Sequence, residues 1–99
     1  MFVHVVLFWC KPVTPESVKQ AIVDYAHKQM PTISSVRHVW AGRSVPSARD
    51  VVDSSYDLGL CVIFDDQAGH DLYQPHDLHQ KFIQLFSSHW SKVRVYDYK

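Results

Sequence analysis

The run of residues 2–9, apolar at every position except His4, is the feature that most limits the possible folds of this chain. It is too short to cross a bilayer, which takes about 20 residues, and it lacks the basic segment and cleavage site of a secretion signal. A short continuous apolar run is typical of a β-strand covered on both faces. On one face His4 lies with Val6 and Phe8, while the other carries Val3, Val5, Leu7 and Trp9. Each face needs its own cover.

The patterns that follow alternate between helix and strand. Thr14 is expected to cap a helix with Pro15 at its first position and Glu16 in its first turn, and Pro31 is expected to end it. Residues 33–45 are predicted to form a strand that is bent or bulged around Gly42, followed by an exposed loop (43–55) and a second strand (56–64). A short helix capped by Asp65 or Asp66 is expected to end near Tyr73. A further helix beyond Pro75 is expected to end near His89, and a last strand (93–98) follows.

The order β-α-β-β-α-β predicts a single α+β domain over residues 1–99, with the split-βαβ, ferredoxin-like plait. Helices in this plait cover only one face of the four-stranded sheet. Leaving the second apolar face of the first strand in water would forgo several kcal/mol of burial. We therefore expect a second copy of the chain to pack against it, sheet on sheet, in a two-fold homodimer.

The composition argues against several classes of partner. Ten basic residues balance ten acidic ones, and no cluster of lysine and arginine exceeds two residues. A nucleic-acid-binding protein carries a basic stripe, so we expect no nucleic-acid partner, and no membrane partner either. The two cysteines, Cys10 and Cys61, form no CxxC motif, which favours reduced thiols and a cytoplasmic protein.

His79 is the polar residue that most needs an explanation. On a helical wheel it falls within the apolar face, opposite the polar face, and Tyr73 lies shortly before it in the chain. A buried polar group without a partner costs about 1–3 kcal/mol, so His79 must find a hydrogen-bond partner or a ligand. One interpretation is purely structural, with the imidazole bonded to a backbone carbonyl or to Tyr73. A purely structural interpretation of Tyr73 is that it only ends the short helix, with its hydroxyl at the surface.

The spacing Tyr73-x2-His76-x2-His79, together with the first strand, the strand 56–64 and the ending Trp90…Tyr96-Asp97-Tyr98, resembles the stress-responsive A/B barrel (Dabb) family. The resemblance covers essentially the whole chain. It implies a ferredoxin-like protomer that pairs with its twin in a dimeric α+β barrel, with a cavity between sheet and helices. Most members have no known function, but a few, similar to olivetolic acid cyclase, act on polyketide-type substrates.

In those cyclases the residues matching Tyr73 and His79 are taken to form an acid–base pair, and the one matching His4 lines the pocket. The chain departs from them at Leu58, where the cyclase carries a further pocket histidine. The resemblance and the residue pattern together predict a pocket lined by His4, Val6, Phe8, Leu58, Leu60, Phe82 and Trp90.

Three functions agree with such a pocket. The first is binding of a small apolar or aromatic molecule, with a physiological role that is unknown. The second is a cofactor-independent cyclase, lyase or isomerase, in which His79 is the general base and Tyr73 donates a hydrogen bond to an oxygen gaining negative charge. The third is a haem- or quinone-type monooxygenase, as in other dimeric α/β barrels.

We expect neither a cofactor nor a metal ion. His4, His76 and His79 would be the candidate metal ligands, but no carboxylate or cysteine is placed beside them in the sequence. His76 is expected at the edge of the helix or as its cap. The remaining histidines are expected at the surface: His27, His38, His70 and His89.

Overall fold

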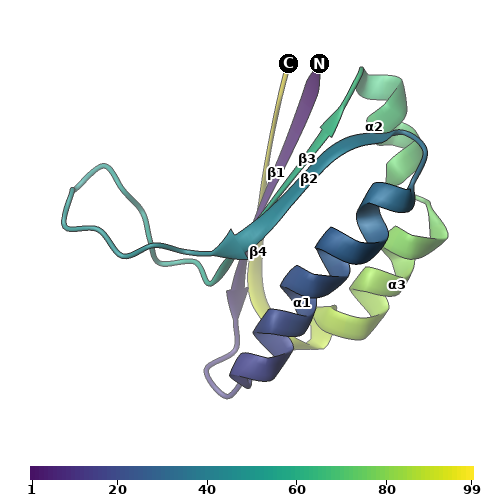
Figure 1. Cartoon of the computed structure of the whole chain (residues 1–99). Helices are drawn as coiled ribbons and strands as arrows, with labels where there is room; N and C mark the ends of the chain where they lie inside the picture. Colours follow the sequence, from purple (N-terminus) through teal and green to yellow (C-terminus); the bar gives the residue numbers. More distant parts are fainter.

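A four-stranded antiparallel sheet with helices on one face forms the protein, whose computed structural model describes residues 1–99 (Figure 1). In chain order the elements are β1 (Phe2–Cys10), α1 (Glu16–Gln29), β2 (Val36–Arg43), β3 (Leu58–Phe64), α2 (Gln67–Tyr73), α3 (Asp77–Phe86) and β4 (Trp90–Tyr98). The strands lie in the order β2-β3-β1-β4. This confirms the predicted α+β, ferredoxin-like plait with its second helical region broken in two. None of the helices has the length and apolar character needed to cross a membrane.

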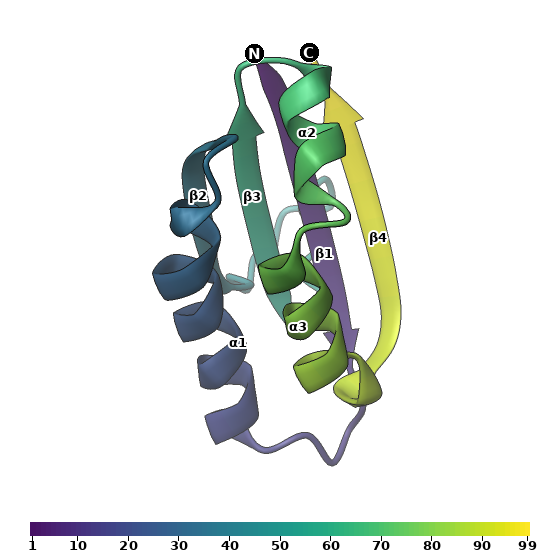
Figure 2. The same cartoon turned by 90° about the vertical axis from the view of Figure 1, so that its right-hand side faces the viewer.

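The helix-covered face of the sheet holds the core. The helices lie over one face of the sheet, in which β1 is a central strand (Figure 2). The β1 side chains His4, Val6 and Phe8 are buried on this face. In register with His4 are Val62 of β3 and Asp97 of β4, so these side chains share its face. The rest of the core includes Ile22, Ala26, Met30, Ile33, Leu58, Phe64, Phe82 and Phe86. α1 and α3 pack on each other, and the Tyr25 hydroxyl donates to the Leu78 carbonyl at 2.8 Å.

The opposite face of the sheet carries no helix (Figure 1). The register assigns to it mainly apolar and aromatic side chains together with two basic ones: Val3, Val5, Leu7, Trp9, His38, Trp40, Cys61, Ile63, Lys92, Arg94, Tyr96 and Tyr98. Trp40 is 67% exposed and Tyr98 is 61% exposed. The connection 44–57 projects away from the helices (Figure 1), and near its end Ser55 accepts a hydrogen bond from Trp9 Nε1 at 3.1 Å. The protomer therefore leaves one broad, mainly apolar sheet face without internal cover.

Two local predictions are wrong. Thr14 does not cap α1: Pro15 precedes the helix in extended conformation, and the buried Thr14 hydroxyl donates to the His89 carbonyl at 3.4 Å. The irregularity of β2 lies between Val36 and His38 and not at Gly42, which stays in register with β3. Both differences arise from contacts between distant segments, which local spacing does not reveal.

Two strands also begin away from their expected starts. β3 begins at Leu58, two residues late. The preceding Asp57 still contacts β1, since its carboxylate accepts the Cys10 backbone N–H at 2.7 Å and its own N–H donates to the Phe8 carbonyl. β4 begins at Trp90, three residues early, directly after a short 3₁₀ turn, Ser87–His89. Pairing of Trp90 with Cys10 extends β4 to this point.

Asp66 is the cap of α2, because its Oδ1 accepts the Gly69 N–H at 3.0 Å, whereas Asp65 pairs with Arg37 at the surface. Asp66→Ala is expected to lower the free energy of unfolding by about 1 kcal/mol, the usual cost of losing such a cap. The control Asp65→Ala removes an exposed ion pair, for which we expect about 0.5 kcal/mol or less. Urea unfolding of both variants measures the difference, and equal losses would contradict the capping role.

Candidate functional site

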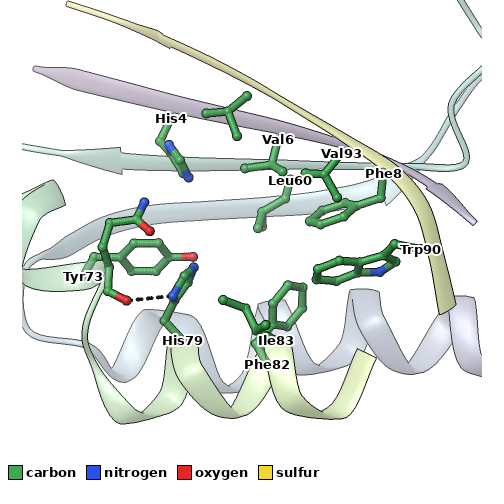
Figure 3. A pocket seen from close by; sticks show the side chains of 12 residues that line it. His4, Val6, Phe8, Leu60, Tyr73, His79, Phe82, Ile83, Trp90 and Val93 are labelled. Atoms are coloured by element: carbon green, nitrogen blue, oxygen red, sulfur yellow. Dashed lines mark hydrogen bonds between the residues drawn. The ribbon is translucent and has the colours of Figure 1, made fainter. Parts of the chain in front are cut away.

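A cavity of ≈140 Å³ lies between the sheet and the helices α2 and α3, and its walls are mainly hydrophobic (Figure 3). The structure brings to it every predicted pocket residue except Leu58: His4, Val6, Phe8, Leu60, Phe82 and Trp90. Leu58 is fully buried in the core elsewhere, four residues along β3 from Val62, which lies level with His4. Placing Leu58 at the cavity is therefore wrong.

Four further residues line the cavity that the sequence did not single out: Gln74, Ile83, Val93 and Val95. Val93 and Val95 are the cross-strand partners of Phe8 and Val6, so the pairing of β4 with β1 would have identified them. Ile83 is 36% exposed, Val93 41% and Val95 48%, which places the mouth of the cavity between α3 and β4.

Tyr73 is the last residue of α2 and points into the protein, with 1% of its surface exposed. The reading that places its hydroxyl at the surface is wrong. Its ring centroid lies 4.6 Å from that of His79, and the hydroxyl points toward the His79 ring (Figure 3). No group of the chain hydrogen-bonds to this hydroxyl. Burial raises the pKa of Tyr73, so the phenol stays protonated at neutral pH and is available as a donor.

His79 has one nitrogen occupied and one free. Its Nδ1 lies 2.9 Å from the Gln74 backbone oxygen (Figure 3). A carbonyl oxygen only accepts, so Nδ1 carries the hydrogen and Nε2 of the neutral ring carries a lone pair. Burial lowers the pKa of His79, which outweighs the opposite effect of the carbonyl. The structural interpretation expected a hydrogen bond from His79 to a backbone carbonyl, and this bond is present. It leaves Nε2 in the cavity wall as a base without a hydrogen-bond partner.

His4 is the third polar group of the cavity wall, and it is 4% exposed. The register of β1 and β4 places it beside Asp97, and its Nδ1 lies 2.5 Å from the Asp97 Oδ1. Burial lowers the pKa of His4, and the hydrogen bond to Asp97 opposes this shift. Its ring meets that of Tyr73 edge-on, with centroids 6.0 Å apart.

The other histidines divide into two groups. His76 accepts the Leu78 N–H at 3.1 Å and so caps α3, while His27 and His38 are exposed as expected. The surface prediction is wrong for His89 and His70, which are both partly buried. His70 stacks on Phe2, with ring centroids 4.6 Å apart. Its position three residues before Tyr73, on the same side of α2, is the signal that could have found it.

Burial of His4 and His79 makes stability depend on pH. Because both folded-state pKa values lie below the ordinary 6.5, the unfolded chain binds protons first as the pH falls. We expect the melting temperature to be highest above pH 6.5 and to decline between pH 6.5 and about 5.5, before most carboxylates titrate. His79→Gln should show a shallower decline in thermal unfolding measured over this range. A native melting temperature that stays constant or rises toward pH 5.5 would contradict the assignment.

Comparison with known proteins gives one family and a set of similar folds. The family model described as Stress responsive A/B Barrel Domain matches residues 2–99. No curated protein sequence matches the chain.

Three solved structures are similar over nearly the whole chain. The Arabidopsis thaliana protein At3g17210 has 20% identity and a TM-score of 0.86, covering 100% of this chain and 94% of that one. A hydroxynitrile lyase from Passiflora edulis has 13% identity and a TM-score of 0.84, covering 98% and 90%. A dimeric ferredoxin-like protein of unknown function from Thermobifida fusca has 14% identity and a TM-score of 0.83, covering 98% and 88%. At these identities the likeness concerns the fold.

Proposed function

Because the chain belongs to the stress-responsive A/B barrel domain family, we propose that it is a homodimer in which each protomer binds one small, largely apolar organic molecule. The observation that carries this proposal is the apolar cavity whose wall includes polar atoms without a hydrogen-bond partner in the chain, among them Tyr73 Oη and His79 Nε2, which face each other. Buried polar groups normally find partners within the protein, so a ligand oxygen is a natural partner for this pair.

The size and chemistry of the cavity define the class of ligand. An engineered apolar cavity of about 150 Å³ in another protein holds benzene, so ≈140 Å³ suits one aromatic ring or a short enolisable chain. A haem macrocycle does not fit this space. The Tyr73 hydroxyl donates to a ligand carbonyl or phenolate oxygen, and His79 Nε2 accepts from a ligand hydroxyl. Phenols and enolised 1,3-diketones combine these features.

The homodimer is supported by the uncovered sheet face. Its apolar side chains, including Val5 and Leu7 of β1, require a cover that the protomer lacks. The similar Thermobifida fusca protein is described as dimeric. The free thiols of Cys10 and Cys61 agree with a cytoplasmic location, which is part of the same proposal.

Titration with phenol and with acetylacetone, followed by calorimetry and ligand-observed NMR, tests the binding proposal. Val95→Trp should fill the mouth of the cavity without disturbing the core, because Val95 is 48% exposed, and should weaken binding roughly tenfold or more. The control Val51→Trp changes an exposed loop residue away from the cavity and should bind like the native protein. Equal affinities of the two variants would place the ligand elsewhere.

A second candidate is a cofactor-independent lyase or cyclase that uses the same cavity. The tautomer of His79 favours it, because Nε2 is free to take a proton from a bound carbonyl compound or hydroxyl group. Tyr73 donates a hydrogen bond to the oxygen that gains negative charge. The structural similarity to a hydroxynitrile lyase supports the ability of this fold to carry lyase chemistry.

A further inference from the structure

We propose that His4, His70 and Asp97 bind a divalent transition-metal ion such as Zn²⁺ or Co²⁺ beside the cavity. One ligand atom from each residue lies within 4.8 Å of the other two. The three residues come from β1, α2 and β4, so the fold gathers them from distant parts of the chain. The site is separate from the Tyr73–His79 pair and does not depend on the function proposed for that pair.

The arrangement is built around His4. This residue is buried and held by β1 in the middle of the sheet, and the β1–β4 register places Asp97 directly beside it. α2 brings His70 over the same point, with its ring centroid 4.9 Å from that of His4. No lysine or arginine pairs with Asp97. Its hydrogen-bond partner is His4 Nδ1, so an ion that binds between the two requires the His4 hydrogen to move to Nε2, and the carboxylate then neutralises the charge of the ion.

The types of ligand select the class of metal. Two imidazoles and one carboxylate are the ligands that zinc and other first-row transition ions prefer, whereas Mg²⁺ and Ca²⁺ prefer oxygen atoms alone. Three protein ligands also leave a coordination position open. His4 lines the cavity, so that position is accessible to water or to an oxygen of a bound molecule.

The ligand atoms must rearrange around an ion, because His4 Nδ1 and Asp97 Oδ1 are now 2.5 Å apart while the three ligand atoms lie up to 4.8 Å from one another. Bonds of about 2.0–2.2 Å bring tetrahedral ligand atoms to roughly 3.4 Å from one another. Asp97 lies near the end of an edge strand, and its side chain is 37% exposed. His70 lies on a helix of only 7 residues. Asp97 and His70 are therefore the ligands that adjust their positions around the buried His4.

His70 already has the partner that a metal-bound histidine requires. Its Nδ1 lies 3.3 Å from the Asp71 carboxylate, which orients the ring and leaves Nε2 for the ion. Nε2 now lies 3.0 Å from the Gln74 side-chain nitrogen, a contact that the ion replaces. This set differs from the trio of His4, His76 and His79 weighed from the sequence, since His76 Nδ1 is engaged in capping α3.

Titration of the chelator-treated, tag-free protein with ZnCl₂ or CoCl₂ tests the proposal. We expect one ion per protomer by calorimetry, and visible absorption bands of Co²⁺ at low coordination number. His70→Ala and Asp97→Asn should each weaken binding roughly tenfold or more, with unchanged circular dichroism. The matched controls His27→Ala and Asp50→Asn change exposed residues outside the site and should bind like the native protein.

Two results would overturn the proposal: no saturable binding, or an affinity in His70→Ala equal to that of the native protein, which indicates an adventitious ion only. A separate variant distinguishes this site from the ligand site. His79→Ala should keep the Co²⁺ spectrum, since His79 is not among the three ligands, while its binding of phenol changes. MgCl₂ should not displace the bound ion.

Discussion

In the proposed homodimer, Val5→Glu should separate the two copies into monomers. Val5 lies at the centre of the uncovered sheet face, with Cys61 on one side and Tyr96 on the other. A carboxylate buried there against a second copy would have no partner, which costs several kcal/mol and is enough to dissociate most dimers. Size-exclusion chromatography with light scattering measures the change directly.

The control for this prediction is Val13→Glu, which adds the same charge at a valine that is 88% exposed outside the face. This variant should stay dimeric. A dimeric Val5→Glu protein would show that the two copies meet through another surface, and the sheet face would then need a different cover.

His79→Ala and Tyr73→Phe are expected to reduce turnover by about 10²–10⁴-fold if the protein catalyses proton transfer on an enolisable substrate. The reason is geometric: His79 Nε2 and the Tyr73 hydroxyl are the polar atoms that face each other in an apolar cavity. Tyr73→Phe should retain most of the substrate affinity and lose mainly kcat, because the phenol acts on charge that develops during the reaction.

The pH dependence of the rate gives an independent check. Because burial lowers the pKa of His79, its neutral, basic form persists below pH 6.5. The rate should therefore be constant from pH 8 down to about 6.5 and fall only at more acidic pH. The exposed-histidine variant His27→Ala should keep the native profile. Full activity in both His79→Ala and Tyr73→Phe would reject catalysis by this pair and leave binding alone.

Most of the fold was predictable because its signals are local. The continuous apolar run of residues 2–9, the apolar spacing of the helices and the breaks at Pro31 and Pro75 are signals that depend on neighbouring residues alone. The errors occur where contact with a distant segment of the chain determines how a helix or strand begins. Thr14 meets the turn before β4 instead of capping its own helix, and β4 starts early because Trp90 pairs with Cys10.

The candidate site shows the same division. His4 and His79 were predictable from strand alternation and from the helical wheel, which need no knowledge of packing. Leu58 and His70 were misplaced because their surroundings depend on which core side chains pack over the end of β3 and on where α2 crosses the sheet. The tautomer of His79 could not be predicted from the sequence either, because it is set by a hydrogen bond to the backbone carbonyl of Gln74.

The alternating arrangement of β1 also limits how its gene segment can vary. His4 faces the cavity, and Val5, the next residue, faces the open side of the sheet. Deleting or inserting a single codon upstream in the strand would exchange these environments for every residue beyond it. Substitutions in this strand should therefore be far better tolerated than insertions or deletions of whole codons, which would disrupt both the cavity and the uncovered sheet face.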